Sequence, residues 1–168
     1  MKIKQDSGIT LVVLIITVII LSIIAGISMN IGTGLIKRTK LENLKTNMLL
    51  IQARAKEYVE EASFKSGTDN TINDEVKSEL IGTEITDTSI LNSKILEQCS
   101  IDSGLYYKLE KEHLKEMGLE KIEITDKNYY IVVYDIKNIK VDVINTRGYV
   151  SEDGNIYYTL SQLNKINK

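Results

Sequence analysis

The chain has 168 residues, which is enough for one folded domain and a membrane-anchoring segment. Its formal net charge of -2 gives no indication of binding to nucleic acid or to an anionic surface. The single cysteine, Cys99, excludes an internal disulfide, so we expect packing to hold the domain together and Cys99 to be a small buried hydrophobic residue.

The first predicted element is an apolar helix. Residues 9–29 read ITLVVLIITVIILSIIAGISM and carry no charge. A helix of this length, rising about 1.5 Å per residue, matches the roughly 30 Å hydrocarbon core of a bilayer. Isoleucine and valine often favour strands, but a lone segment in lipid satisfies its own backbone only as a helix. We therefore expect 9–29 to span a membrane. A cleaved secretory signal fits less well, because its apolar region is only about 7–15 residues long.

A distinctive junction precedes this segment. The polar leader MKIKQDSG, residues 1–8, ends in Gly8, and the apolar run starts at once with Ile9. This junction resembles the prepilin-type cleavage and methylation motif of type IV pilins and type II secretion pseudopilins. The resemblance implies that a prepilin peptidase cuts after Gly8 and methylates Ile9 as the new N-terminus. Thr10 and Leu11 match the next two positions of the motif.

Val13 departs from the motif. Pilins usually have a glutamate at this mature position, and it pairs with the N-terminal amine of a neighbouring subunit during assembly. Valine cannot form that pair, and a buried charge without a partner is costly, so a subunit without the glutamate needs no such neighbour. Within the family, the minor pseudopilin at the filament tip lacks the glutamate, which indicates a minor subunit. A Gram-positive subgroup lacks it as well, so a major subunit stays open.

The helix is predicted to continue beyond the membrane as an amphipathic segment over residues 30–65. Apolar residues recur there at alternating spacings of three and four, and the charged residues between them are expected to face solvent or neighbours. With 9–29, the segment makes one helix roughly 85 Å long, which ends before the loop at 66–70. The alternatives are an ordinary core helix and a helix that dimerises as a short coiled coil. The stripe consists of Leu41, Leu44, Met48, Ile51, Ala55, Tyr58 and Ala62.

Residues 66–168 are predicted to form an α+β head. Weak helical patterns cover 71–82 and 88–98, and residues 105–118 indicate a short strand or turn followed by a helix that ends at Gly118. Strands are expected at 129–134 and 139–144, the second with Ile139, Val141 and Val143 facing inward, and a third piece at 149–158 turns at 152–155. A long helix packed on a small antiparallel sheet is pilin-like.

Residues that could carry chemistry do not form a convincing active site. His113 lies in a run of lysine and glutamate and is expected to be exposed and not catalytic. Residues 151–155 carry oxygen ligands but are too short for a calcium loop, so a hairpin turn is expected there. Gly32 and Gly34 do not continue into a phosphate-binding motif. We predict no enzyme, no cofactor and no metal.

The resemblance predicts a structural subunit, in the cytoplasmic membrane first and in a cell-surface or extracellular filament afterwards. Its partners are expected to be the prepilin peptidase, the membrane and other pilin or pseudopilin subunits. No nucleic acid is expected, since a DNA-uptake subunit needs a basic patch that the mixed charges do not indicate.

The alternative function is a single-span anchor whose soluble domain binds a partner without forming a filament. The positive charges flanking the span favour it, since Lys2 and Lys4 precede the span and four cations follow it. The positive-inside rule then keeps the C-terminal part in the cytoplasm, against the filament topology. The four cations are Lys37, Arg38, Lys40 and Lys45.

Overall fold

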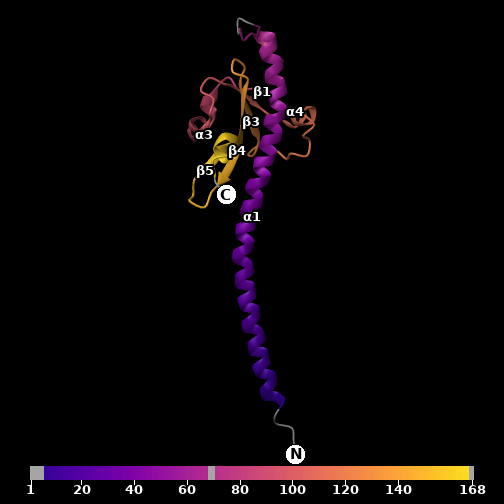
Figure 1. Ribbon diagram of the computed structural model, residues 1–168, viewed down its shortest axis with the longest axis vertical. Helices are drawn as coiled ribbons and strands as arrows, with labels where there is room; N and C mark the ends of the chain where they lie inside the picture. Colours follow the sequence, from indigo (N-terminus) through magenta and orange to yellow (C-terminus); the bar gives the residue numbers. More distant parts are fainter. Residues whose placement is uncertain (1–5, 68–70, 167–168) are drawn as a thin grey trace, which may run out of the picture. The chain divides into compact units, whose positions relative to one another are not determined.

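The computed structural model describes residues 6–67 and 71–166 (Figure 1). Within the first range, the side chains of residues 6–13, 15 and 23–34 lie outside the description. The chain divides into two compact units, Met1–Glu42 and Asn43–Lys168.

A single long helix, α1 (Asp6–Ser66), contributes to both units. It ends as predicted near residue 65, and Gly67 follows it with a φ of 64°. In the second unit, α1 buries one side completely. The fully buried side chains are Met48, Ile51, Ala55, Val59 and Ala62, and Ser66 extends this row at 8% exposure.

The period of this buried row differs from the predicted stripe. Five steps lead from Met48 to Ser66, which is the 3.6-residue period of a straight helix rather than the 3.5-residue period of a coiled coil. Val59 therefore takes the inward position predicted for Tyr58, which is only half-buried. Because the chain itself covers the row, the row offers no surface to a second helix, and the coiled-coil alternative is wrong for these residues.

In the described residues, five strands form one antiparallel sheet in the order β1-β2-β3-β4-β5. The hairpin β3–β4 and its continuation into β5 confirm the predicted meander. The pairing of β1 and β2 onto β3 was not predicted. The strands are β1 (Thr83–Glu84), β2 (Leu105–Lys108), β3 (Tyr130–Asp135), β4 (Lys140–Val150) and β5 (Ile156–Thr159).

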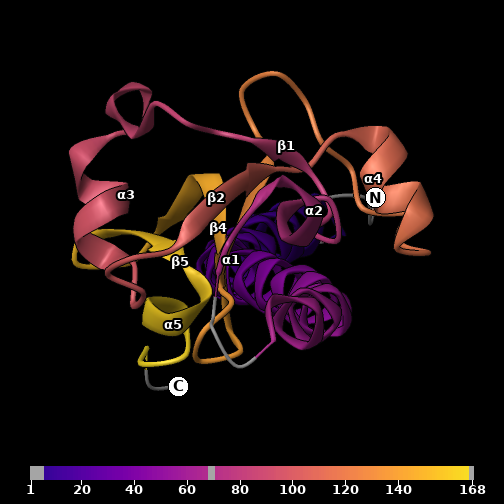
Figure 2. The same cartoon turned by 90° about the horizontal axis from the view of Figure 1, so that it is seen from above.

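Both faces of the sheet are covered (Figure 2). On one face, Gln52 of α1 donates a hydrogen bond to the carbonyl of Val141 at 2.7 Å, and Tyr130 interacts with Asn47 of α1. On the other face, Ile131, Val133 and Ile144 pack beneath the segment that contains α3 (Ser93–Gln98). Two covered faces explain why β3 is apolar at consecutive positions instead of alternating.

Short helices connect these layers. The helices predicted at 71–82 and 88–98 are shorter in the structure. They are α2 (Asp74–Lys77) in the first range, and the 3-10 turn η1 (Thr88–Ile90) and α3 in the second. The helix predicted before Gly118 is α4 (Lys111–Glu116), and Gly118 follows it with a φ of 70°. The last helix, α5 (Leu160–Leu163), follows β5 directly. The α+β class is therefore confirmed.

The predicted start and end of the second strand were wrong. Ile139 is a turn residue with a φ of 51°, and its side chain is 44% exposed rather than inward-facing. Strand β4 then extends to Val150, so the pair 149–150 belongs to it and not to a separate third piece. The register shifts between Ile144 and Tyr149, and Gly148 adopts a φ of 69° there, so a bulge allows one long strand to pair with β5.

Candidate functional site

The first half of α1 exposes its large apolar side chains. At about 100° of rotation per residue, these neighbouring positions cover every side of the helix. A helix that is apolar all round has no face that prefers water, so it is buried in a core or in a membrane. The six large apolar side chains described between residues 14 and 21 are 49–65% exposed: Leu14, Ile16, Val18, Ile19, Ile20 and Leu21.

The two hydroxyl groups described in residues 14–22 bond within their own helix. Thr17 donates to the carbonyl of Leu14, and Ser22 donates to the carbonyl of Val18, both at 2.8 Å. Such internal bonds let a hydroxyl enter an apolar environment without losing its hydrogen bond. The described part of the segment is therefore suited to an apolar surrounding on all sides.

The processing and assembly residues lie at the start of α1, but their side chains fall outside the description. This holds for Gly8, Ile9, Thr10, Leu11 and Val13, whose roles stay predictions. Residues 1–5 of the leader lie outside the described residues altogether. Many side chains of the predicted span 9–29 are not described, and among the described residues no helix has the length and apolarity needed to cross a bilayer.

Cys99 is partly buried against the core of the head. Burial raises the pKa of its thiol, and the nearby carboxylates of Asp142 and Asp102 add to the increase. A thiol with a raised pKa holds less of the nucleophilic thiolate at neutral pH. Cys99 therefore behaves as the predicted small hydrophobic residue.

His113 is half-buried, not exposed as predicted, because it helps to begin helix α4. Its Nδ1 accepts a hydrogen bond from the backbone N–H of Glu110 at 3.0 Å. This bond satisfies a backbone donor at the helix start, which is a structural role.

The turn at 151–155 satisfies its oxygen atoms internally. Asp153 accepts hydrogen bonds from Ser151 and from the Asn155 side chain, the latter at 2.6 Å. Hydrogen bonds from Ser151 and from Asn155 lower the pKa of Asp153. Among the described residues, no three histidine, cysteine, aspartate or glutamate side chains gather in a way that could hold a metal ion.

The sequence did not reveal the most connected polar group of the head, Asp142. The alternation of β4 placed it outside, yet it is 2% exposed. Its carboxylate accepts hydrogen bonds from the hydroxyls of Ser100 at 2.9 Å and Ser161 at 2.7 Å. It thereby links β4 to the residues after α3 and to α5. Only the second covering layer makes this position internal, so strand periodicity carried no signal for it.

Gln98 secures the edge of the sheet beside this group. Its side-chain amide donates to the carbonyl of Ile156 at 2.7 Å and accepts from the N–H of Tyr158 at 2.8 Å. These bonds occupy backbone groups of the edge strand β5, which otherwise invite pairing with another strand.

Comparison of the chain with protein-family profiles, with curated proteins and with solved structures finds no match.

Proposed function

We propose that the chain is a structural subunit, of the minor class, of a type IV pilus-like or type II secretion-like filament. Its pilin-like helix is anchored in the cytoplasmic membrane, processed after Gly8 and then assembled into a cell-surface or extracellular filament. The observation that carries the proposal is the all-round apolar surface of residues 14–21, in a helix whose later residues are covered by a sheet.

The physical basis is that one apolar surface suits two surroundings. Lipid covers it before assembly, and the apolar helices of other subunits cover it in the filament. Full burial of a valine, leucine or isoleucine side chain contributes about 1.5–3 kcal/mol relative to leaving it in water. Six such side chains that are about half exposed therefore represent a large free-energy cost for any aqueous state.

The minor class is proposed from Val13, and no enzymatic activity is proposed. Without the usual glutamate, the apolar segment carries no charge that another subunit must neutralise. Packing alone then drives its assembly. The expected partners are the prepilin peptidase and other pilin or pseudopilin subunits.

Mass spectrometry of the mature protein tests the proposal. We expect an N-terminus at Ile9 that carries a methyl group, in a chain that lacks residues 1–8. Gly8→Ala should block the cut and keep the chain in the membrane, and Ser7→Ala is the matched control that should be processed normally. A mature chain that begins at Met1, with Gly8→Ala indistinguishable from the parent, would falsify the proposal.

A second candidate is a membrane anchor that forms no filament. The cations Lys37, Arg38 and Lys40, all exposed and C-terminal to the apolar segment, favour it through the positive-inside rule. Protease treatment of intact cells without their outer layers distinguishes the two. Digestion of residues 43–168 from outside supports the filament subunit, whereas protection supports a domain that faces the cytoplasm.

A further inference from the structure

The end of α1 carries an aromatic side chain that its own chain leaves uncovered. Phe64, the single phenylalanine of the chain, is 89% exposed, which is unusual for a side chain of this size. It lines an open groove together with Glu57, Glu60 and Glu61 of α1, and Glu79 lines the groove from the segment after α2. Residues 57, 60, 61 and 64 share one helix face, because they are spaced by three or four. We call this surface the Phe64 groove.

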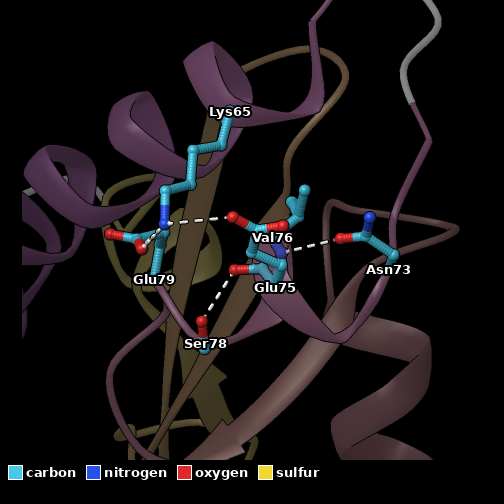
Figure 3. Close-up of polar contacts among 6 residues, drawn as sticks. All are labelled: Lys65, Asn73, Glu75, Val76, Ser78 and Glu79. Atoms are coloured by element: carbon cyan, nitrogen blue, oxygen red, sulfur yellow. Dashed lines mark hydrogen bonds and ion pairs between the residues drawn. The ribbon is translucent and has the colours of Figure 1, made fainter.

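The wall of the groove opposite α1 is ordered. The ammonium of Lys65 forms ion pairs with Glu79 and, at 4.0 Å, with Glu75, which fixes the end of α1 to α2 (Figure 3). Asn73 caps α2 by accepting a hydrogen bond from the N–H of Val76 at 2.9 Å. The charge of Lys65 is therefore already used within the head.

The other carboxylates of the groove are less engaged. Glu57 pairs with Arg54 at 3.2 Å on the exposed surface, which is a weak interaction. Glu60 and Glu61 form no ion pair in the described part of the chain. The groove thus presents an exposed aromatic ring beside negative charge, which favours a partner that presents an apolar side chain beside positive charge.

A second uncovered apolar side chain lies at the turn between β3 and β4. Ile139 is 44% exposed, and among the described residues it is the one non-glycine residue with a positive φ, 51°. A β-branched residue avoids this left-handed region, and glycine or asparagine is usual in such turns. Residues held in such conformations are concentrated at functional sites. We therefore attribute the isoleucine to a contact outside its own head.

Two lysines flank this side chain. Lys137 and Lys140 are exposed, and neither forms an ion pair among the described residues. The turn is ordered, because Asp135 accepts hydrogen bonds from the backbone N–H of Asn138 at 3.1 Å and from its side-chain amide at 2.7 Å. One aspartate and two lysines leave the turn net positive. It thus presents an isoleucine beside positive charge, which complements the Phe64 groove.

The groove and the turn do not meet within one chain. Both belong to the unit Asn43–Lys168, which contains the whole sheet. Within that unit Phe64 is almost fully exposed, so Ile139 does not cover it, and no residue of the turn lines the groove. A contact between the two patches therefore requires a second copy.

We propose that the Phe64 groove of one copy of this chain binds the β3–β4 turn of a second copy. Ile139 lies against Phe64, and Lys137 and Lys140 lie among the carboxylates of the groove. Because each copy carries both patches, the contact either closes two copies reciprocally or continues to a third copy. The inference goes beyond the proposed function and does not depend on it, because two anchored copies can make the same contact in a membrane.

Photo-cross-linking of the full-length chain in producing cells tests the contact. The benzophenone amino acid p-benzoylphenylalanine replaces Phe64, which preserves an aromatic side chain, and ultraviolet light joins it to the carbon–hydrogen bonds that it touches. We expect a covalent dimer on a denaturing gel, with the link mapped by mass spectrometry to residues 136–140. The same amino acid in place of Ile90, which is 70% exposed in the same unit, is the matched control and gives no link to these residues.

Charge reversal tests the pairing. Lys137→Glu with Lys140→Glu should reduce the dimer about tenfold, since like charges then face each other. Adding Glu60→Lys with Glu61→Lys to the same chain should restore it. All four positions are exposed, so every variant should keep the unfolding midpoint of the parent.

Two further variants separate the contact from stability and from overall charge. Ile139→Asn should also reduce the dimer without destabilising the head, since it removes the apolar side chain but relieves the left-handed strain. Lys121→Glu with Lys127→Glu changes the net charge by the same amount as the reversal in the turn, at exposed positions outside both patches. This pair should leave the yield of dimer unchanged.

Absence of the dimer, a link to other residues, or a dimer that survives the reversal in the turn overturns the contact. A loss that the second reversal does not restore overturns it as well. The mature N-terminus is measured on the same samples. Processing at Ile9 without the dimer refutes only the contact, whereas the dimer from chains that begin at Met1 refutes only the filament function.

Discussion

Two stretches of α1 contain similar apolar side chains, which are exposed in the first stretch and largely buried in the second. In residues 14–21, isoleucine, leucine and valine are 49–65% exposed. In residues 48–62, one row of apolar side chains is fully buried, whereas Leu49 and Leu50 on the outer side are 47% exposed. The buried row is Met48, Ile51, Ala55, Val59 and Ala62. The first stretch belongs to the unit Met1–Glu42, and the second belongs to Asn43–Lys168, which supplies the sheet that covers it.

The difference shows that the exposure of an apolar helix depends on which other parts of its own chain pack against it. The outer side of the second stretch is polar apart from Leu49, Leu50 and Ala53, so one covered face buries most of its apolar surface. The described side chains of the first stretch are apolar all round, so one covered face would not bury them. Under the proposed function, lipid or other chains would cover them.

The same truncation in the two stretches should give the sharpest contrast. Ile51→Ala removes a fully buried side chain and should cost about 4 kcal/mol of the free energy of unfolding of the head. Ile19→Ala, the matched control, changes a side chain that is 53% exposed and should leave that free energy unchanged. Urea unfolding of the full-length chain in detergent, followed by tyrosine circular dichroism, measures both. Equal losses would break the comparison.

Removing a polar side chain should likewise destabilise the head much more in the second unit than in the first. Asp142→Ala leaves the hydroxyls of Ser100 and Ser161 without their acceptor and should cost about 3 kcal/mol. Ser22→Ala removes a hydroxyl that bonds only to its own helix backbone and should change head stability by less than about 0.5 kcal/mol. Asp142→Asn should lose less than Asp142→Ala. A neutral Asp142→Ala would show that the buried network does not stabilise the head.

Alkaline pH should unfold the head and spare the first stretch, because all nine tyrosines follow residue 42. Burial raises the pKa of Tyr107 from 10.0 to about 12, and it also raises that of Tyr134. Folding thus favours the neutral phenol, so this stability is complete below pH 10.0 and is lost as pH rises toward about 12. Circular dichroism during an alkaline titration measures the loss. Tyr107→Phe should move the midpoint upward, and an unchanged midpoint would contradict this account.

A small gain is expected at the β3–β4 turn. Ile139 is a β-branched residue in the left-handed region, with a φ of 51°. Ile139→Asn should relieve this strain and stabilise the head by about 1 kcal/mol in urea unfolding. Lys137→Asn in the same turn is the control and should give no gain, since Lys137 does not have a positive φ. A loss at position 139 would mean that the exposed isoleucine packs better than its conformation suggests.

The sequence was sufficient for the elements with local signals. The end of α1, the stop of α4 at Gly118 and the antiparallel meander follow from hydrophobic period, glycine and turn residues, which act within a few positions of the chain. The α+β class followed from the order of these elements.

Only the tertiary structure decided what covers each surface. The two-residue strand β1 exists because β2 pairs with it, and so short a segment has no pattern of its own. Asp142 is internal because a second layer lies on the far face of the sheet, and Val59 replaces Tyr58 because a straight helix on a sheet keeps a 3.6-residue period. These outcomes depend on contacts between residues far apart in the chain, and such contacts leave no mark on local periodicity.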